Sequence, residues 1–134
     1  YINPGDPEAA AEMAYRDARI SHVKNGVYGS MWVAAMIAEA YVTDDMKRII
    51  QTGLSQIPSS SRLHKAVTNI IEMHEKGVSA EDCISDIRTR WDENAAYDWC
   101  HTIPPRFCMV IKITVNLSVW RSGHVLIPIV TAQP

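Results

Sequence analysis

The residues with the most chemical potential lie close together near the start of the chain. Ser21-His22 is followed by Asn25-Gly26-Val27-Tyr28-Gly29, a run that opens a predicted helix. A histidine beside such a turn can donate to a phosphate or transfer a proton. Backbone N–H groups of the glycine run can donate hydrogen bonds to an anion, and the N-terminus of a helix favours negative charge. The alternatives are a surface histidine near a helix C-terminus and glycines that only permit a tight corner. The pattern alone favours these alternatives.

Other polar clusters do not complete a metal site or a catalytic set. Asp44-Asp45 could ligate a metal, but adjacent carboxylates before a helix are typical of a helix cap. His64 and His74 are too far apart to form one helical metal pair, and Cys100-His101 lacks the remaining ligands. From the residues alone we therefore name no catalytic and no metal-binding residue.

The composition is that of one globular domain. The chain has 134 residues, of which 47% are hydrophobic and 21% charged, and its net charge is −2. This balance does not mark a nucleic-acid binder, and no apolar run approaches the roughly 20 residues that a membrane span needs. The three cysteines lack the spacing of a disulfide framework or a zinc site, which favours a cytoplasmic location.

Residues 1–104 are predicted to form an all-α, multi-helix bundle, because apolar residues recur there at helical spacing. The second helix is apolar around most of its circumference, so we place it at the centre of the bundle. The five helices are predicted over residues 7–22, 29–42, 46–57, 62–76 and 79–97. Their predicted caps and stops are Asp6, Asp44 or Asp45, one of Ser59, Ser60 and Ser61, Gly77, and Ser79 paired with Asp82.

Charge and composition change near Pro104-Pro105. Residues 1–104 carry a net charge of −5, whereas residues 105–134 carry +3 and no acidic residue. The second segment is rich in β-branched residues, which favour strands, but a lone hairpin is marginal in water. We therefore divide the chain into a helical domain fragment, 1–104, and an unrelated-looking tail, 105–134, that is irregular or hairpin-like.

Several short motifs follow one another in a fixed order along residues 1–104. They are Asn3-Pro4-Gly5, Ala9-Ala10, Ala14-Tyr15-Arg16-Asp17-Ala18, Ser21-His22, Asn25-Gly26-Val27-Tyr28-Gly29, Ala34-Ala35-Met36, Ile57-Pro58, Ser61-Arg62, Tyr97 and His101-Thr102-Ile103-Pro104. This ordered set resembles the ADP-ribosylglycohydrolase family, which includes dinitrogenase reductase-activating glycohydrolase and the J1 crystallins.

The resemblance implies an all-α fold that binds ADP-ribose in a cleft with two magnesium ions and cleaves a glycosidic bond at the ribose. In the family, the histidine of a Ser-His pair contacts the phosphates of the ligand. Carried over, this residue is His22, with Ser21 beside it and with Asn25, Gly26 and Tyr28 in the nearby wall of the site. The resemblance thus implies a substrate-binding role for all five residues. The implied partner is ADP-ribose or an ADP-ribosylated substrate, with no role for nucleic acid or membrane.

The metal ligands of the family come from an acidic motif near one end of the full protein and an Asp-x-Asp motif near the other. Neither motif occurs in these 134 residues. We therefore expect a fragment of a hydrolase whose intact parent uses magnesium, and we expect this chain alone to hold no metal and to be inactive. The alternative is a non-catalytic helical domain, either crystallin-like or nucleotide-binding.

The tail is compatible with a shifted reading frame. Combining the last base of each codon with the first two bases of the next, over residues 126–134, permits Asp-Thr-Asp-Ser-Asn-Gly-Ala-Thr, which resembles the second acidic motif of the family. The hypothesis is that a frameshift, genuine or from sequencing, replaced the metal-binding segment. The DNA sequence of this region tests it directly.

Overall fold

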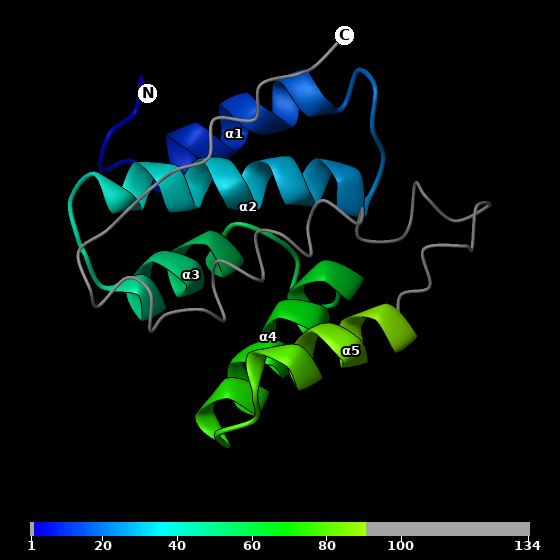
Figure 1. The fold of residues 1–134 in the computed structure, drawn as a ribbon. Helices are drawn as coiled ribbons and strands as arrows, with labels where there is room; N and C mark the ends of the chain where they lie inside the picture. Colours follow the sequence, from blue (N-terminus) through cyan, green and yellow to red (C-terminus); the bar gives the residue numbers. More distant parts are fainter. Residues whose placement is uncertain (1, 91–134) are drawn as a thin grey trace, which may run out of the picture.

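The computed structural model describes residues 2–90, which form five α-helices and no strand (Figure 1). The all-α prediction is therefore confirmed for this part of the chain. The helices are α1 (Pro7–Ala18), α2 (Asn25–Ala40), α3 (Met46–Ser55), α4 (Arg62–Glu75) and α5 (Ala80–Arg90). The end of the predicted fifth helix and the whole predicted tail lie outside the described residues. Across residues 2–90, no helix is long and apolar enough to cross a bilayer.

Helix α1 begins as predicted, with Asp6 as its cap. The Asp6 side chain accepts a hydrogen bond of 3.0 Å from the backbone N–H of Ala9, and Pro7 occupies the first helical turn. The helix ends at Ala18, four residues before the predicted end at His22. Past that point the N–H groups of residues 20 and 21 bond to carbonyls three residues back, so the chain tightens into a turn.

Helix α2 begins at Asn25, which corrects the predicted start at Gly29. The Asn25–Gly29 run, which was predicted to open the helix, lies entirely inside it and forms its first turn. The break in the chain falls one residue earlier, at Lys24, whose positive φ of 47° is outside the helical region. The helix ends at Ala40, two residues before the predicted end at Val42.

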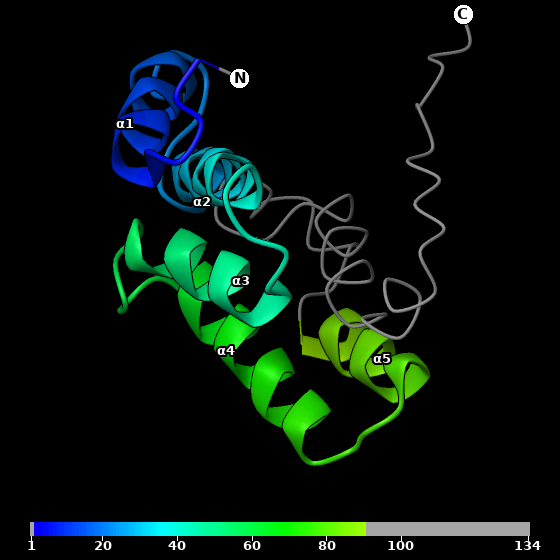
Figure 2. The ribbon, with the colours of Figure 1, turned by 90° about the vertical axis from the view of Figure 1, so that its left-hand side faces the viewer.

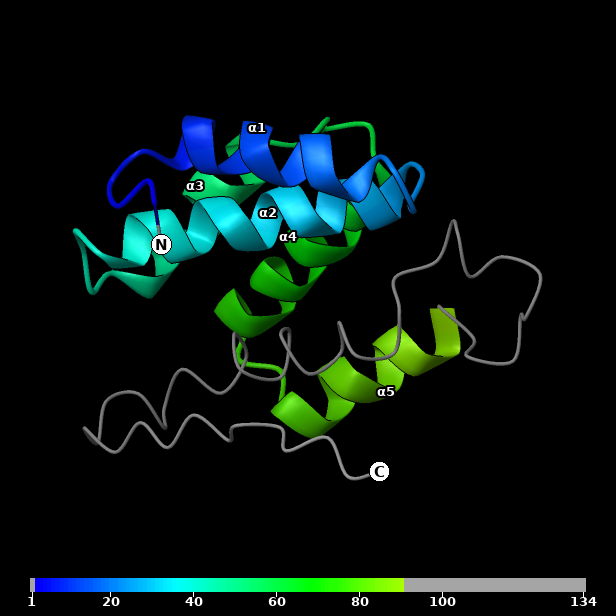
Figure 3. The ribbon, with the colours of Figure 1, turned by 90° about the horizontal axis from the view of Figure 1, so that it is seen from above.

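Helix α2 occupies the predicted central position. It packs against α1 on one side and against α3 and α4 on the other. Figure 2 shows this order, with α2 between α1 and α3, and Figure 3 shows α4 passing beneath α2 at an angle. Trp32 on α2 is completely buried at the heart of the core. The core cluster consists of Trp32, Ile50, Leu54, Ile57, Leu63, Ala66 and Val67.

The predicted caps of the later helices are confirmed. Asp45 accepts from the N–H groups of Lys47 and Arg48, and Ser61, one of three candidate serines, accepts from His64. Ser79 accepts from the N–H of Asp82 at 3.1 Å. These bonds satisfy N–H groups that have no partner inside the helix. The capping box differs in one respect, since the Ser79 hydroxyl also donates to the Asp82 carboxylate at 2.8 Å.

Gly77 ends α4 as predicted. Its φ is +76°, a left-handed conformation that glycine adopts without steric cost. The N–H of Gly77 donates to the carbonyl of His74, and the N–H of Val78 donates to that of Met73. This pair of bonds is a Schellman motif, which satisfies two carbonyls at the end of the helix.

Candidate functional site

The Ser21-His22 pair lies in the connection between α1 and α2. The hydroxyl oxygen of Ser21 and Nδ1 of His22 are 2.8 Å apart, within hydrogen-bond distance. The backbone N–H of His22 donates to the carbonyl of Ala18 at 2.8 Å, which holds the residue at the end of α1. Both side chains are exposed, so the imidazole can reach a ligand in solvent.

The imidazole of His22 packs against the first turn of α2. A Cβ atom added to Gly26 would lie 3.1 Å from both Cβ and Cδ2 of His22. A ring can approach the helix this closely because Gly26 has no side chain. The structure therefore places His22 against both Ser21 and Gly26, which brings together three of the five predicted site residues.

The other two predicted site residues face the interior. Asn25 is 7% exposed, and its side-chain oxygen accepts a hydrogen bond of 3.4 Å from the backbone N–H of Leu63. Tyr28 is half-buried and packs against the core cluster. Both residues support the wall behind His22, and a direct contact of either one with a ligand stays a prediction.

Two backbone N–H groups of the glycine run are already engaged within the chain. The N–H of Gly26 donates to the carbonyl of Val23 at 3.1 Å, and that of Tyr28 donates to the carbonyl of Lys24 at 3.0 Å. These two groups are therefore not open to an anion, which agrees with the alternative that the pattern alone favoured.

The N-termini of α2 and α4 meet beside this corner, which the sequence did not predict. The Asn25–Leu63 bond joins the first residue of one helix to the second residue of the other, and Figure 1 shows both helices beginning at the same end of the bundle. A helix N-terminus carries a partial positive charge. Two of them together favour an anion at this end. In the sequence, the start of α4 was marked by the Ser61-Arg62 motif, but nothing indicated that it lies beside the start of α2.

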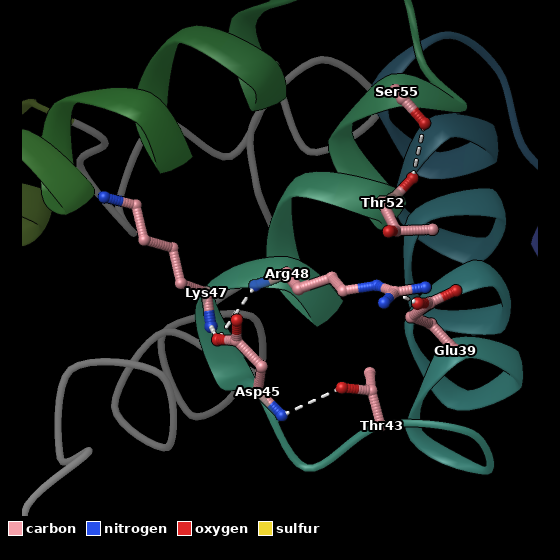
Figure 4. A network of polar contacts seen from close by, with 7 residues as sticks. All are labelled: Glu39, Thr43, Asp45, Lys47, Arg48, Thr52 and Ser55. Atoms are coloured by element: carbon pink, nitrogen blue, oxygen red, sulfur yellow. Dashed lines mark hydrogen bonds and ion pairs between the residues drawn. The ribbon is translucent and has the colours of Figure 1, made fainter.

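The described residues do not provide a metal site. Within residues 2–90, no three His, Cys, Asp or Glu side chains lie close enough together to hold a metal ion. Asp45 acts as the cap of α3, as expected (Figure 4). His64 is within 3.4 Å of the Thr68 hydroxyl on its own helix. Cys100-His101 lies outside the described residues.

A buried carboxylate on α2, that of Glu39, forms an ion pair with a residue of α3. Glu39 on α2 is 5% exposed, and its carboxylate lies 2.7 Å from Nε of Arg48 on α3 (Figure 4). The guanidinium is itself largely exposed. The pair reaches from the core to the surface at the α2–α3 contact, which indicates a structural role.

A groove of about 230 Å³ lies between α1 and α2, away from the predicted site residues. Its lining is almost entirely apolar and carries no titratable group. The lining residues are Ile2, Asn3, Ala10, Met13, Ala14, Ala34, Ile37 and Ala38. Such a lining offers no group for acid–base chemistry.

A family model described as ADP-ribosylglycohydrolase matches residues 1–118. This range covers most of the chain and includes every predicted site residue. No curated protein and no solved structure matches the chain significantly. The match continues past the predicted domain boundary at residue 104, and the division at that point stays a prediction.

Proposed function

Because the chain belongs to the ADP-ribosylglycohydrolase family, we propose that it is part of a hydrolase that releases ADP-ribose from a modified substrate. Family membership supports the class of reaction. The ADP-ribosylated substrate, and magnesium in the intact parent, are proposed from the resemblance. We also propose a cytoplasmic location.

One arrangement carries the proposal for the ligand. His22 lies at the corner between α1 and α2, with Nδ1 within hydrogen-bond distance of Ser21 and the ring against Gly26. A pyrophosphate is negatively charged and accepts hydrogen bonds, so a nearby imidazole donor and two helix N-termini all favour it. We place the phosphates of ADP-ribose at this corner.

In this proposal His22 contacts the ligand directly, and its neighbours hold the surrounding backbone in place. The imidazole donates to a phosphate oxygen, and the exposed position of the ring leaves room for the ligand. Asn25 and Tyr28 hold the start of α2 against the core. Magnesium would supply the activation of water in the intact parent.

Calorimetric titration of ADP-ribose into the chain tests the proposal. We expect His22→Ala to weaken binding by about 1–3 kcal/mol, the range for losing a hydrogen bond to a charged group. The matched control is His74→Ala, which removes another exposed histidine, at the far end of α4. Equal affinity of wild type and His22→Ala would overturn the ligand role of His22, and a lowered melting temperature together with equal affinity would make it a structural residue.

The second candidate is a helical domain that binds a nucleotide without cleaving it. The absence of both acidic motifs from the printed sequence favours this function for the chain by itself. Incubation with ADP-ribosyl-arginine and magnesium should then release no ADP-ribose. An acidic metal motif upstream in the genomic locus would favour the hydrolase for the intact parent, and magnesium-dependent release by the chain would exclude the non-catalytic candidate.

A further inference from the structure

The hydrogen bond between Ser21 and His22 bears on which ring nitrogen can serve a ligand. A neutral imidazole carries one hydrogen, either on Nδ1 or on Nε2, and the bond at one nitrogen decides the role of the other. The Ser21 hydroxyl is 2.8 Å from Nδ1. If the hydroxyl donates there, the hydrogen of the ring stays on Nε2. If Nδ1 donates instead, Nε2 has only a lone pair, which a phosphate oxygen would repel.

The contact with Gly26 decides where the Nε2 edge lies. The position of an added Cβ atom at Gly26 is 3.1 Å from Cβ, 3.1 Å from Cδ2 and 3.4 Å from Cγ of His22. Cβ and the Cγ–Cδ2 edge of the ring therefore face α2, while Nδ1 lies within hydrogen-bond distance of Ser21. Cε1 and Nε2 are not among the three atoms nearest to this position, and the residue is exposed.

We propose that Ser21 and Gly26 are positioning residues for His22: the Ser21 hydroxyl donates to Nδ1 and keeps the proton on Nε2, and Gly26 leaves the space that directs Nε2 toward the ligand. The inference rests on the proposed function for its ligand, which accepts hydrogen bonds. It assigns Ser21 and Gly26 no direct contact with ADP-ribose, in contrast to the substrate-binding role predicted from the sequence.

The role of Ser21 is tested on the full chain with ¹⁵N-labelled histidine. Multiple-bond ¹H–¹⁵N spectra, recorded at a pH where the ring is neutral, identify the protonated nitrogen, and His22→Ala assigns the signals among the five histidines. We expect the proton of His22 on Nε2 in wild type and in Ser21→Thr, which keeps the hydroxyl. Ser21→Ala should raise the Nδ1–H population, whereas Ser55→Ala, which removes an exposed hydroxyl on α3, should not.

The same variants are titrated with ADP-ribose. Loss of one hydrogen bond predicts a decrease in affinity of about 2- to 10-fold for Ser21→Ala, with Ser21→Thr close to wild type. A proton on Nδ1 in wild type, or identical ring spectra for wild type and Ser21→Ala, would overturn the role of Ser21. If the spectra respond to Ser21→Ala but no variant binds ADP-ribose, the proposed function fails and the control of the ring nitrogens stands.

Gly26→Ala tests the steric part separately. The added methyl group would crowd the His22 side chain, so this side chain must shift by a few tenths of an ångström. Alanine is a better helix former than glycine, so the variant should melt at the wild-type temperature or above it. We expect ADP-ribose affinity to decrease by a factor of 3 or more, an effect of about 0.6 kcal/mol. Unchanged affinity with intact folding would overturn the role of Gly26.

Discussion

The side-chain oxygen of Asn25 accepts a hydrogen bond from the backbone N–H of Leu63 at 3.4 Å, which ties the first residue of α2 to the first turn of α4. The two residues are 38 positions apart in the sequence. Ser61 caps the same turn of α4 by accepting from His64. The start of α4 is thus held by one local and one distant side chain, and the corner that carries His22 is built on this joint.

The first prediction concerns Asn25→Ala. The N–H of Leu63 is buried, because Leu63 is 1% exposed, and removing its acceptor leaves it unsatisfied. We expect the free energy of unfolding to decrease by about 1–3 kcal/mol, measured by urea denaturation. Gln51→Ala, an exposed substitution on α3, is the control and should change it by less than about 0.5 kcal/mol. An effect of Asn25→Ala no larger than that of the control would show that the joint is unimportant for stability.

The second prediction concerns Gly53, where α3 lies close against α2. A Cβ atom at this position would lie 2.7 Å from Cγ of Met36 and closer still to the ring of Trp32, which is fully buried. Gly53→Ala should therefore lower the free energy of unfolding by about 1–3 kcal/mol through overpacking, despite the higher helix propensity of alanine. Ser55→Ala on the same helix is the control. A stabilised Gly53→Ala variant would contradict the close contact.

The third prediction concerns the pair of Glu39 and Arg48. Arg48→Met leaves the buried carboxylate of Glu39 without its guanidinium at 2.7 Å, so we expect a loss of about 1–3 kcal/mol in urea denaturation at neutral pH. Replacing both residues by methionine removes the buried charge as well and should restore most of the loss. A double variant that is no more stable than Arg48→Met would argue against charge as the cause.

The fourth prediction is a pH dependence. The Lys47 ammonium donates to Glu75 at 2.7 Å, and this bond lowers the pKa of Glu75 below 4.5 and raises the pKa of Lys47 above 10.5. A lowered carboxyl pKa stabilises the fold above its unfolded value and loses that effect as the pH falls through the folded value. A raised lysine pKa stabilises the fold below its unfolded value and loses that effect as the pH rises through the folded value.

The stabilisation from this pair is therefore complete between pH 4.5 and 10.5 and fades on both sides. The urea midpoints of wild type and Glu75→Gln should differ slightly in this window, because the pair is exposed. The difference should shrink as the pH falls below 4.5 and when salt is added. A difference that is independent of both pH and salt would point to packing and not to charge.

Local contacts explain why the sequence predicted so much of the fold. The caps at Asp6, Asp45, Ser61 and Ser79 and the stop at Gly77 each depend on bonds between residues within about five positions. Such contacts can be inferred from residue types and spacing. The error at the start of α2 also has a local cause, because glycine and asparagine suit a turn as well as the first turn of a helix.

The sequence by itself determined the helices, their caps and the family resemblance of residues around Ser21-His22. Only the tertiary structure decided which side chains of this segment face the interior and which face the solvent. Asn25 is buried and accepts a hydrogen bond from the N–H of Leu63 on another helix, whereas His22 is exposed and lies against Gly26. These orientations depend on the packing of α1, α2 and α4, and no local pattern encodes the distance between elements that meet only in the folded chain.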